Sequence, residues 1–344
     1  MSSKKAYAQA GVDVDLGNKV KSGLGKLLAK TKRPEVLGKV GGFGGLFRAS
    51  FKGFKDPVLV GSVDGVGTKL KIAVDTGKHD TIGADLVNHC INDIAVLGAE
   101  PLFFMDYIGT GKLEPKVFEQ IVSGLANACA AANCSLIGGE TAQMPGVYQG
   151  KDYDLVGCIV GIVDRAKMID GTKIKEGDII IGLESSGLHT NGYSLARKIL
   201  FDQLKLKLTS KIPGEKEPLG KLLLRTHINY LPFVKALGKA VTIKGMAHIT
   251  GGGLIDNLPR ILPKNVNAFI DRGSWKISPL YHLLCEKGRV SEEERYQTFN
   301  MGIGYCFVVS SKDVDKTMAL LRKLRAKPSI IGQIEKGTGI VRIV

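Results

Sequence analysis

The chain has 344 residues, of which 44% are hydrophobic and 6% aromatic, and its formal net charge is +15. That length is about twice that of a typical domain, so we expect two globular domains. No apolar stretch reaches about 18 residues, and the opening MSSKKAYAQA lacks the apolar core of a signal peptide, so neither a membrane protein nor a secreted one is expected.

The distribution of charge argues against a nucleic-acid-binding protein. Such proteins usually gather basic and aromatic residues on one element, and this sequence shows no such cluster. Residues 61–160 instead carry 12 acidic and 6 basic side chains. An acidic middle within a basic chain suits a divalent metal and anionic small molecules, although solvated lysines on helix faces explain most single charges as well.

The cysteines indicate a cytoplasmic protein. They form no Cys-x-x-Cys pair and have no histidine at zinc-finger spacing, so we expect reduced and mostly buried thiols. The six positions are Cys90, Cys129, Cys134, Cys158, Cys285 and Cys306.

In chain order, the first half alternates strands and helices. The first expected element is a short basic helix within residues 20–36, which Pro34 stops. A glycine-rich loop follows at 38–47. The other expected elements are strands at 57–63, 101–109, 134–141 and 153–163 and helices at 79–101 and 114–133. This alternation is typical of an α/β domain.

A turn-rich bridge at 165–178 separates the two halves, which predicts domains 1–168 and 169–344. The second half alternates again. Its expected elements are strands at 178–187, 243–253, 265–271 and 299–310 and helices at 192–204, 219–239 and 312–327. The predicted fold class is α/β (of the α+β type), with two α/β domains.

Four acidic residues of the acidic middle are candidate metal ligands. Asp64, Asp106 and Glu140 stand at or just after predicted strands, and Asp93 lies on the predicted helix 79–101. Because strand ends line the ligand crevice of an open α/β sheet, these carboxylates can converge. Converging carboxylates bind a hard cation such as Mg²⁺, usually together with substrate phosphates. Ordinary caps or surface acids explain the same residues equally well.

Two glycine-rich stretches are candidate phosphate sites, although the chain has neither a Walker A loop nor a Gly-x-Gly-x-x-Gly motif. In SVDGVGTK, Gly65 would let the backbone approach a phosphate and Lys69 would neutralise it, while a plain turn is the alternative. A second stretch offers free N–H groups to a phosphate, or forms a mobile lid. It consists of Gly41, Gly42, Phe43, Gly44 and Gly45.

The stretch ESSGLHTNGYSLAR, residues 184–197, combines a strand end with a helix start. Backbone N–H groups there, with Ser185, Ser186 and Asn191 nearby, form a candidate anion site. His189 at its mouth can transfer a proton near neutral pH, although a lone histidine is more often structural.

The stretch HITGGGLIDNLPR, residues 248–260, repeats this arrangement. Thr250, Gly251 and Gly252 stand between a strand and a helix. A second anion site implies a second phosphorylated ligand.

Taken together, these motifs resemble the aminoimidazole ribonucleotide synthetases (phosphoribosylformylglycinamidine cyclo-ligases), the ring-closing ligases of purine biosynthesis. The resemblance covers essentially the whole chain. It rests on AGVDVDLGN, TKRPEVLGKVGGFGG, DGVGTKL, HDTIGADLV, NDIAVLGAEPLFFMDY, GGETAQMPG, YDLVGCIVG, SSGLHTNGYSL, HITGGG and TFNMGIG. A single motif such as DGVGTK would indicate only the wider superfamily, which includes selenophosphate synthetase and thiamine monophosphate kinase.

The resemblance implies a fold, a reaction and partners. It implies that the N-terminal α/β domains of a cytoplasmic homodimer share a barrel and that the C-terminal domain holds a mixed sheet with helices. The implied substrates are ATP and formylglycinamidine ribonucleotide, with Mg²⁺ as cofactor and no nucleic acid or membrane. ATP would phosphorylate the formamide oxygen, and the amidine nitrogen would then attack that carbon, expel phosphate and close the imidazole.

The resemblance also implies roles for the candidate residues. Mg²⁺ would be held by Asp64, Asp93 and Glu140, with Asp106 near them. The ATP phosphates would lie against residues 41–45 and against Gly65, Lys69 and Gly139, and Lys69 would also be catalytic. The reacting amide would lie near His189 and Asn191, and the rest of the substrate would lie near Ser185, Ser186, Thr250, Gly251 and Gly252.

The chain departs from the family pattern at three positions. Gln143 stands where the family has Glu, Leu188 where it has Pro, and Thr190 where it has Ser. Gln143 removes a charge, so it is not counted among the metal ligands.

The sequence leaves two alternative functions open. Selenophosphate synthetase would need a reactive cysteine near the N-terminus, whereas the first cysteine here is Cys90. A non-catalytic RNA-binding protein would show steep salt dependence and release no ADP.

Overall fold

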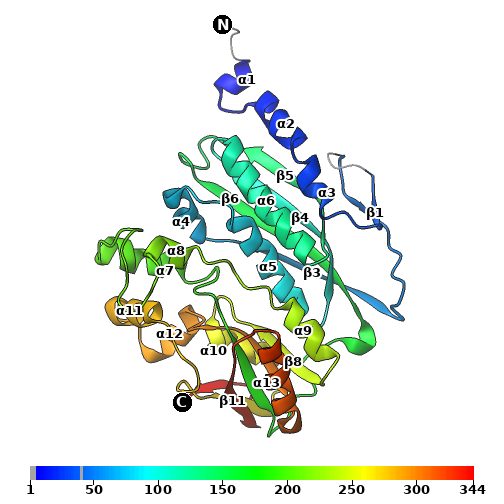
Figure 1. The fold of residues 1–344 in the computed structure, drawn as a ribbon, viewed down its shortest axis with the longest axis vertical. Helices are drawn as coiled ribbons and strands as arrows, with labels where there is room; N and C mark the ends of the chain where they lie inside the picture. The colour runs from blue at the N-terminus through cyan, green and yellow to red at the C-terminus, as the bar shows by residue number, and fades with distance from the viewer. Residues whose placement is uncertain (1–4, 39–41) are drawn as a thin grey trace. The chain divides into compact units, whose positions relative to one another are not determined.

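The computed structural model describes residues 5–38 and 42–344 and divides the chain into two compact units. The first unit comprises residues 1–94 and 99–166, and the second comprises residues 95–98 and 167–344. The short 3₁₀ helix η1(Arg165–Lys167) contains the junction, where the sequence predicted a boundary after residue 168. Figure 1 colours both units from blue to red along the chain.

The first unit is built on a four-stranded sheet with the order β3-β6-β4-β5. The strands are β3(Pro57–Gly65), β4(Glu100–Thr110), β5(Ser135–Gln143) and β6(Tyr153–Asp164). β6 pairs antiparallel with both β3 and β4, while β4 and β5 run parallel. A separate two-stranded sheet joins β1(Val36–Leu37) to β2(Leu46–Phe47).

Helices cover one face of the four-stranded sheet (Figure 1). The helices of the first unit are α1(Ala6–Gln9), α2(Val14–Ser22), α3(Gly25–Ala29), α4(Lys69–Thr76), α5(Ile82–Ala95) and α6(Pro115–Ala131). α5 and α6 approach so closely that a Cβ on Gly83 would lie 2.2 Å from the Ile121 carbonyl oxygen. Side chains at that crossing would push the helices apart, so glycine fixes the position of α5.

The burial along the strands alternates, which leaves the second sheet face partly exposed. On β3, the side chains of Leu59 and Val63 are 57% and 65% exposed. Val58 and Val60, on either side of Leu59 in the sequence, are half-buried. Such alternation is typical of a sheet with one face packed on a core.

The second unit is built on a six-stranded mixed sheet with the order β12-β9-β11-β7-β10-β8. Its strands are β7(Ile179–Glu184), β8(Ile243–His248), β9(Val266–Ile270), β10(Ile303–Val309), β11(Pro328–Lys336) and β12(Val341–Ile343). β12 and β9 are parallel, and the other pairs are antiparallel. Every residue of β10 is buried, as expected for a strand that lies between two neighbours.

The helices of the second unit are short. They are α7(Tyr193–Arg197), the π-helix η2(Lys198–Gln203), α8(Leu219–Leu223), α9(Leu231–Gly238), α10(Gly253–Asn257), η3(Leu258–Ile261), α11(Pro279–Gly288), α12(Glu292–Thr298), η4(Ser311–Asp313) and α13(Val314–Lys323). Among the described residues, no helix has both the length and the apolar character needed to cross a bilayer.

The predicted fold class, two α/β domains, is confirmed, but the local elements differ in several places. The sequence analysis lacked the strands β1, β2, β11 and β12 and the helices α1, α11 and α12. The sequence did not predict α4, which follows β3 directly and ends at Gly77 with φ +66°. The predicted helix 192–204 changes from α to π geometry after Arg197. The strand predicted from residue 299 begins at Ile303, because Met301 (φ +48°) and Gly302 (φ +94°) form a turn before it.

Candidate active site

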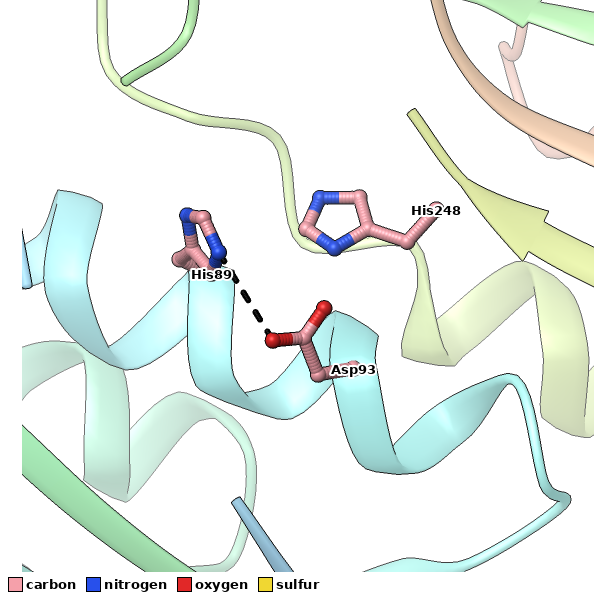
Figure 2. A group of neighbouring side chains, drawn as sticks. All are labelled: His89, Asp93 and His248. Atoms are coloured by element: carbon pink, nitrogen blue, oxygen red, sulfur yellow. Dashed lines mark ion pairs between the residues drawn. The ribbon is translucent and has the colours of Figure 1, made fainter. Parts of the chain in front are cut away.

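Two of the predicted metal ligands meet in the first unit around a histidine that the sequence analysis did not select. The His89 Nε2 lies 2.7 Å from an Asp64 carboxylate oxygen and 3.6 Å from an Asp93 carboxylate oxygen. Asp64 is the last residue but one of β3. His89 and Asp93 stand one turn apart on α5 (Figure 2). The fold therefore gathers two carboxylates that are far apart in the sequence.

Each of these two carboxylates also accepts a hydrogen bond from a residue of β3. The Gly65 backbone N–H donates to Asp64 Oδ1 at 2.7 Å, and the Ser62 hydroxyl donates to Asp93 Oδ2 at 3.3 Å. The Asp64 and Asp93 side chains are 39% and 27% exposed, whereas that of His89 is only 4% exposed. The histidine thus lies beneath two carboxylates that remain open to an incoming cation.

The electrostatics of this group favour a charged pair. Burial alone would raise the pKa of Asp64, but the hydrogen bond and charge of His89 outweigh it and lower that pKa. Burial alone would lower the pKa of His89, but the hydrogen bond of Asp64 and the charge of Asp93 outweigh it and raise that pKa. An ionised Asp64 is the form that binds a hard cation.

Glu140, the third predicted metal ligand, is placed differently from the prediction. Asp64, Gly157, Asp106 and Gly139 stand in one row across the four strands. Glu140 pairs with Tyr107 in the next row. Successive side chains alternate between faces, so this register directs Glu140 to the face opposite Asp64. The predicted set of three carboxylates is therefore divided, with Glu140 separated from Asp64 and Asp93.

Glu140 instead lines a cavity of about 770 Å³ near the edge strand β5. Asp106, Gly139 and residues 42–45 line the same cavity, and Lys21 of α2 adds a positive charge. The sequence analysis had assigned residues 41–45 and Gly139 to the ATP phosphates, and residues 42–45 and Gly139 line this one cavity. It had not selected Lys21. Gly41 of the same predicted loop lies outside the described residues.

Asp106 lies so close to Gly139 that no residue larger than glycine fits at position 139. A Cβ on Gly139 would meet the Asp106 carboxylate at 2.5 Å. Burial raises the pKa of Asp106 to about 7, so this carboxyl takes up a proton near neutral pH. The folded protein binds that proton more tightly than the unfolded chain, in which the pKa is about 4.

The raised pKa predicts a stability that falls with rising pH. As the pH rises from about 4 to about 7, the folded state loses stability relative to the unfolded chain, and the full loss persists above pH 7. A rise in pKa from about 4 to about 7 corresponds to about 4 kcal/mol. Asp106 keeps some contact with solvent, which screens its charge, so we expect a loss of about 1–2 kcal/mol. Urea unfolding with EDTA at pH 5.5 and 8.0 should show this loss in the wild type and its absence in Asp106→Asn. Equal pH dependence in both proteins would contradict the raised pKa.

Lys69 is also placed differently from the prediction. Its ammonium lies 2.7 Å from the Asp85 carboxylate, and both side chains are 0% exposed. Burial lowers the pKa of Lys69 and Asp85 opposes that shift. A fully enclosed ammonium cannot contact an incoming phosphate, so the arrangement argues against the predicted phosphate and catalytic roles of Lys69. Gly65, which was grouped with it, continues β3 and fixes Asp64 through its N–H.

In the second unit, His189 belongs to a group of three buried histidines. Its ring stacks on that of His227 with centroids 4.0 Å apart, and the His227 Nε2 lies 2.9 Å from the His248 Nε2. The His189 Nε2 accepts a hydrogen bond from the Ser186 N–H at 3.1 Å. His189 has φ +59°, an uncommon conformation that places its ring over the turn after β7.

The other predicted substrate residues surround this turn. The Ser185 hydroxyl donates to the Gly187 carbonyl at 2.9 Å, and the Ser186 hydroxyl donates to the Thr226 carbonyl at 2.6 Å. Both hydroxyls therefore stabilise the turn rather than point toward a ligand. Asn191 approaches the second glycine stretch, because a Cβ on Gly251 would meet the Asn191 side-chain oxygen at 3.2 Å.

The second glycine stretch is held by Asn257 of α10. The Asn257 amide donates to the carbonyls of Gly251 and Gly253 at 3.2 and 2.7 Å, and its oxygen accepts from the Thr250 hydroxyl at 3.4 Å. Gly252 has φ +92° and precedes α10 directly. The structure thus brings the turn after β7 and the stretch 250–252 together, as two loops of one unit.

Comparisons with known proteins follow the same division of the chain. The family described as AIR synthase related protein, N-terminal domain, matches residues 52–163, and the corresponding C-terminal domain matches residues 175–344. A phosphoribosylformylglycinamidine cyclo-ligase of Thermodesulfovibrio yellowstonii is 50% identical over 96% of this chain and 96% of its own length. One from Geobacillus sp. (strain WCH70) is 50% identical over 98% of this chain and 97% of its own length.

Solved structures share the fold at much lower identity. A thiamine-monophosphate kinase from Stenotrophomonas maltophilia has a TM-score of 0.68 at 20% identity, covering 92% of this chain and 94% of that one. The hydrogenase maturation protein HypE from E. coli also has a TM-score of 0.68, at 16% identity, covering 95% of this chain and 93% of that one. A structure of HypE in complex with ATP has a TM-score of 0.65 at 17% identity, covering 95% and 90%. These likenesses establish the fold alone.

Proposed function

This chain belongs to the family of phosphoribosylformylglycinamidine cyclo-ligases, and we propose how its residues carry out that family's reaction. The resemblance expected from the motifs is confirmed. The chain is a ligase of purine biosynthesis that converts formylglycinamidine ribonucleotide to 5-aminoimidazole ribonucleotide and converts ATP to ADP and phosphate. The observation that carries the assignment of roles is the grouping of Asp64 and Asp93 around His89.

The donor set around His89 fits Mg²⁺. Asp64 and Asp93 offer partly exposed carboxylate oxygens, the ligands that this cation prefers. Mg²⁺ bound there would neutralise charge on the phosphates of ATP. The buried His89, with its raised pKa, would orient both carboxylates from below and keep Asp64 ionised. Ser62 would fix Asp93 through its hydroxyl.

The cavity beside β5 is the proposed ATP site. Residues 42–45 would lie against the phosphates, since glycines leave the backbone N–H groups accessible. Lys21 would supply the positive charge that Lys69, enclosed with Asp85, cannot supply. Gly139 and Asp106 would form the wall of this site, and Glu140, the next residue on β5, would border it.

The two loops of the second unit are the proposed site for formylglycinamidine ribonucleotide. The Asn191 side chain and the exposed Gly251 would bind it, with the stretch 250–252 against its phosphate. Phosphorylation of the formamide oxygen would turn that oxygen into a phosphate leaving group. The amidine nitrogen would then attack the formyl carbon, the C–O bond would break, and the departing phosphate would take the proton released by the nitrogen. His189 is buried and its Nε2 already accepts from the Ser186 N–H, so it would position the turn that carries Asn191.

His189→Ala should lower kcat by about 100-fold, because the turn loses the ring that fixes it and a misplacement of about 1 Å at a reacting group costs roughly this factor. ATP affinity, measured by equilibrium titration, should stay within about twofold of the wild type. His282→Ala, at an exposed histidine on α11, is the matched control and should keep full activity. A kcat of the His189 variant close to that of the wild type would remove this residue from the reaction.

A homodimer is proposed from the partly exposed face of the four-stranded sheet. Leu59 and Val63 of β3 present apolar side chains there. An exposed apolar sheet face commonly marks an interface, and a second copy would cover it in the way that the family resemblance implies. A cytoplasmic location is proposed from the six cysteines, which are all free thiols.

Val63→Lys should shift the protein from dimer to monomer, because a charge would be buried where the apolar faces meet. Light scattering after size exclusion measures the mass directly. Ile340→Lys, at an exposed apolar residue of the second unit, should leave the mass unchanged. A monomeric wild type, or a dimeric Val63 variant, would contradict the proposed interface.

The deciding assay supplies ATP, Mg²⁺ and formylglycinamidine ribonucleotide and follows both ADP and 5-aminoimidazole ribonucleotide. We expect the two products in equal amounts. ADP release without the imidazole would indicate a different acceptor, as in the thiamine-monophosphate kinase that shares this fold.

A further inference from the structure

The first unit contains a second cavity, of about 240 Å³, that the proposed reaction does not use. It is bounded by the end of α4, the end of β4, the start of α6 and the start of β6. Its wall is mostly apolar, and its apolar lining consists of Val74, Ile108, Leu113, Val117, Phe118 and Ile121. An apolar cavity of about 150 Å³ is enough for benzene, so this one has room for a ring and one substituent.

Two buried polar side chains line the cavity. His79 is 5% exposed and Tyr153 is 7% exposed, and the His79 Nδ1 lies 2.9 Å from the Tyr153 hydroxyl oxygen. The described residues offer the Tyr153 hydroxyl no other acceptor, so we take it to donate to Nδ1, and the proton of the neutral imidazole is then on Nε2. In the part of the chain that the structure describes, no residue bonds to that Nε2. His79 can therefore donate a hydrogen bond to a molecule in the cavity.

The charge around the cavity favours an anion. Lys112, Lys116 and Lys151 line it, against one acidic residue, Glu114. The 17-residue helix α6 begins here, and the side chain of its N-cap residue Glu114 makes no hydrogen bond to the first turn. Pro115, the first residue of α6, has no N–H, and the Phe118 N–H bonds to the Glu114 carbonyl. The described residues thus leave the N–H groups of Lys116 and Val117 for another acceptor, at the end of the helix where anions are stabilised.

We propose that this cavity binds a small aromatic carboxylate. The ring would pack among the apolar side chains, and the carboxylate would accept from the His79 Nε2 and interact with Lys151 and Lys116. This site is separate from the residues assigned to ATP and to the ribonucleotide. It would therefore take a ligand that is not a substrate of the ring closure.

Titration calorimetry of the full-length protein with benzoate tests the proposal. We expect saturable one-to-one binding, weakened at least tenfold in His79→Phe and in Lys151→Gln. Benzamide, which has the same ring without the charge, should bind at least tenfold more weakly than benzoate. Lys239→Gln, at an exposed lysine of the second unit, is the control and should bind benzoate as the wild type does. Ring closure should be unchanged in all three variants.

Three results would overturn the proposed benzoate site. The absence of saturable benzoate binding to the wild type would overturn the proposal. So would equal affinity for benzoate and inorganic phosphate with no effect of His79→Phe, because that result indicates surface lysines alone. If His79→Phe fails to fold, the variants His79→Gln and Lys151→Gln provide the test instead. Benzoate affinity equal to that of the wild type in both of these variants would also overturn the proposal. Since the ring-closure assay is independent, failure here leaves the proposed function standing.

Discussion

Asp93→Asn should abolish ring closure, with a fall in kcat of about 1,000-fold or more and an intact fold. The amide keeps the size of the side chain and can still accept from the Ser62 hydroxyl, but it removes the negative charge that a cation requires. A loss of about 4 kcal/mol of transition-state stabilisation corresponds to roughly this factor in rate. Coupled measurement of ADP and 5-aminoimidazole ribonucleotide gives the rate, and circular dichroism with urea unfolding reports on the fold.

Asp75→Asn is the matched control for this variant. Asp75 is an exposed aspartate of α4 in the same unit, so its replacement should change neither the rate nor the dependence of the rate on Mg²⁺ concentration. In Asp93→Asn, the residual rate should require a higher Mg²⁺ concentration than in the wild type. A variant with wild-type rate and wild-type Mg²⁺ dependence would remove Asp93 from the cation site.

The sequence selected Asp64, Asp93 and the loop 41–45 because these residues stand in recognisable local patterns. Asp64 follows a strand, Asp93 lies on a helix with clear apolar spacing, and residues 42–45 are almost all glycine. Chain order and strand ends are enough to place such residues at one edge of a sheet. The same reasoning gave the α/β class and the strands β3 to β10, but it missed β1, β2, β11 and β12.

What the sequence could not give depends on packing between distant elements. Lys69 looked like a phosphate ligand because it follows two glycines, and only the tertiary structure encloses it with Asp85. The strand register that separates Glu140 from Asp64 is likewise invisible before β4 and β5 pair. His227 joins His189 only through the fold, and no local pattern marks it. His89 is the exception, because its spacing of four residues from Asp93 on a helix could have indicated it.

Lys69→Met should destabilise the protein by about 3–5 kcal/mol, since removal of one partner leaves the other charge buried alone. The double variant Lys69→Met/Asp85→Leu should recover more than half of that loss, because neither charge is then left without a partner. Urea unfolding of the wild type, the two single variants and the double variant completes the cycle.

ATP binding by the double variant then decides between two roles for Lys69. If the ion pair is structural, the folded double variant should bind ATP within about threefold of the wild type. A direct contact between Lys69 and the phosphates would instead weaken ATP binding at least tenfold in a protein that is otherwise folded. Lys21→Gln should show that tenfold loss, because Lys21 lines the proposed ATP cavity and Lys69 is enclosed away from solvent. Strong ATP binding by the Lys21 variant, together with weak binding by the double variant, would return the phosphate role to Lys69.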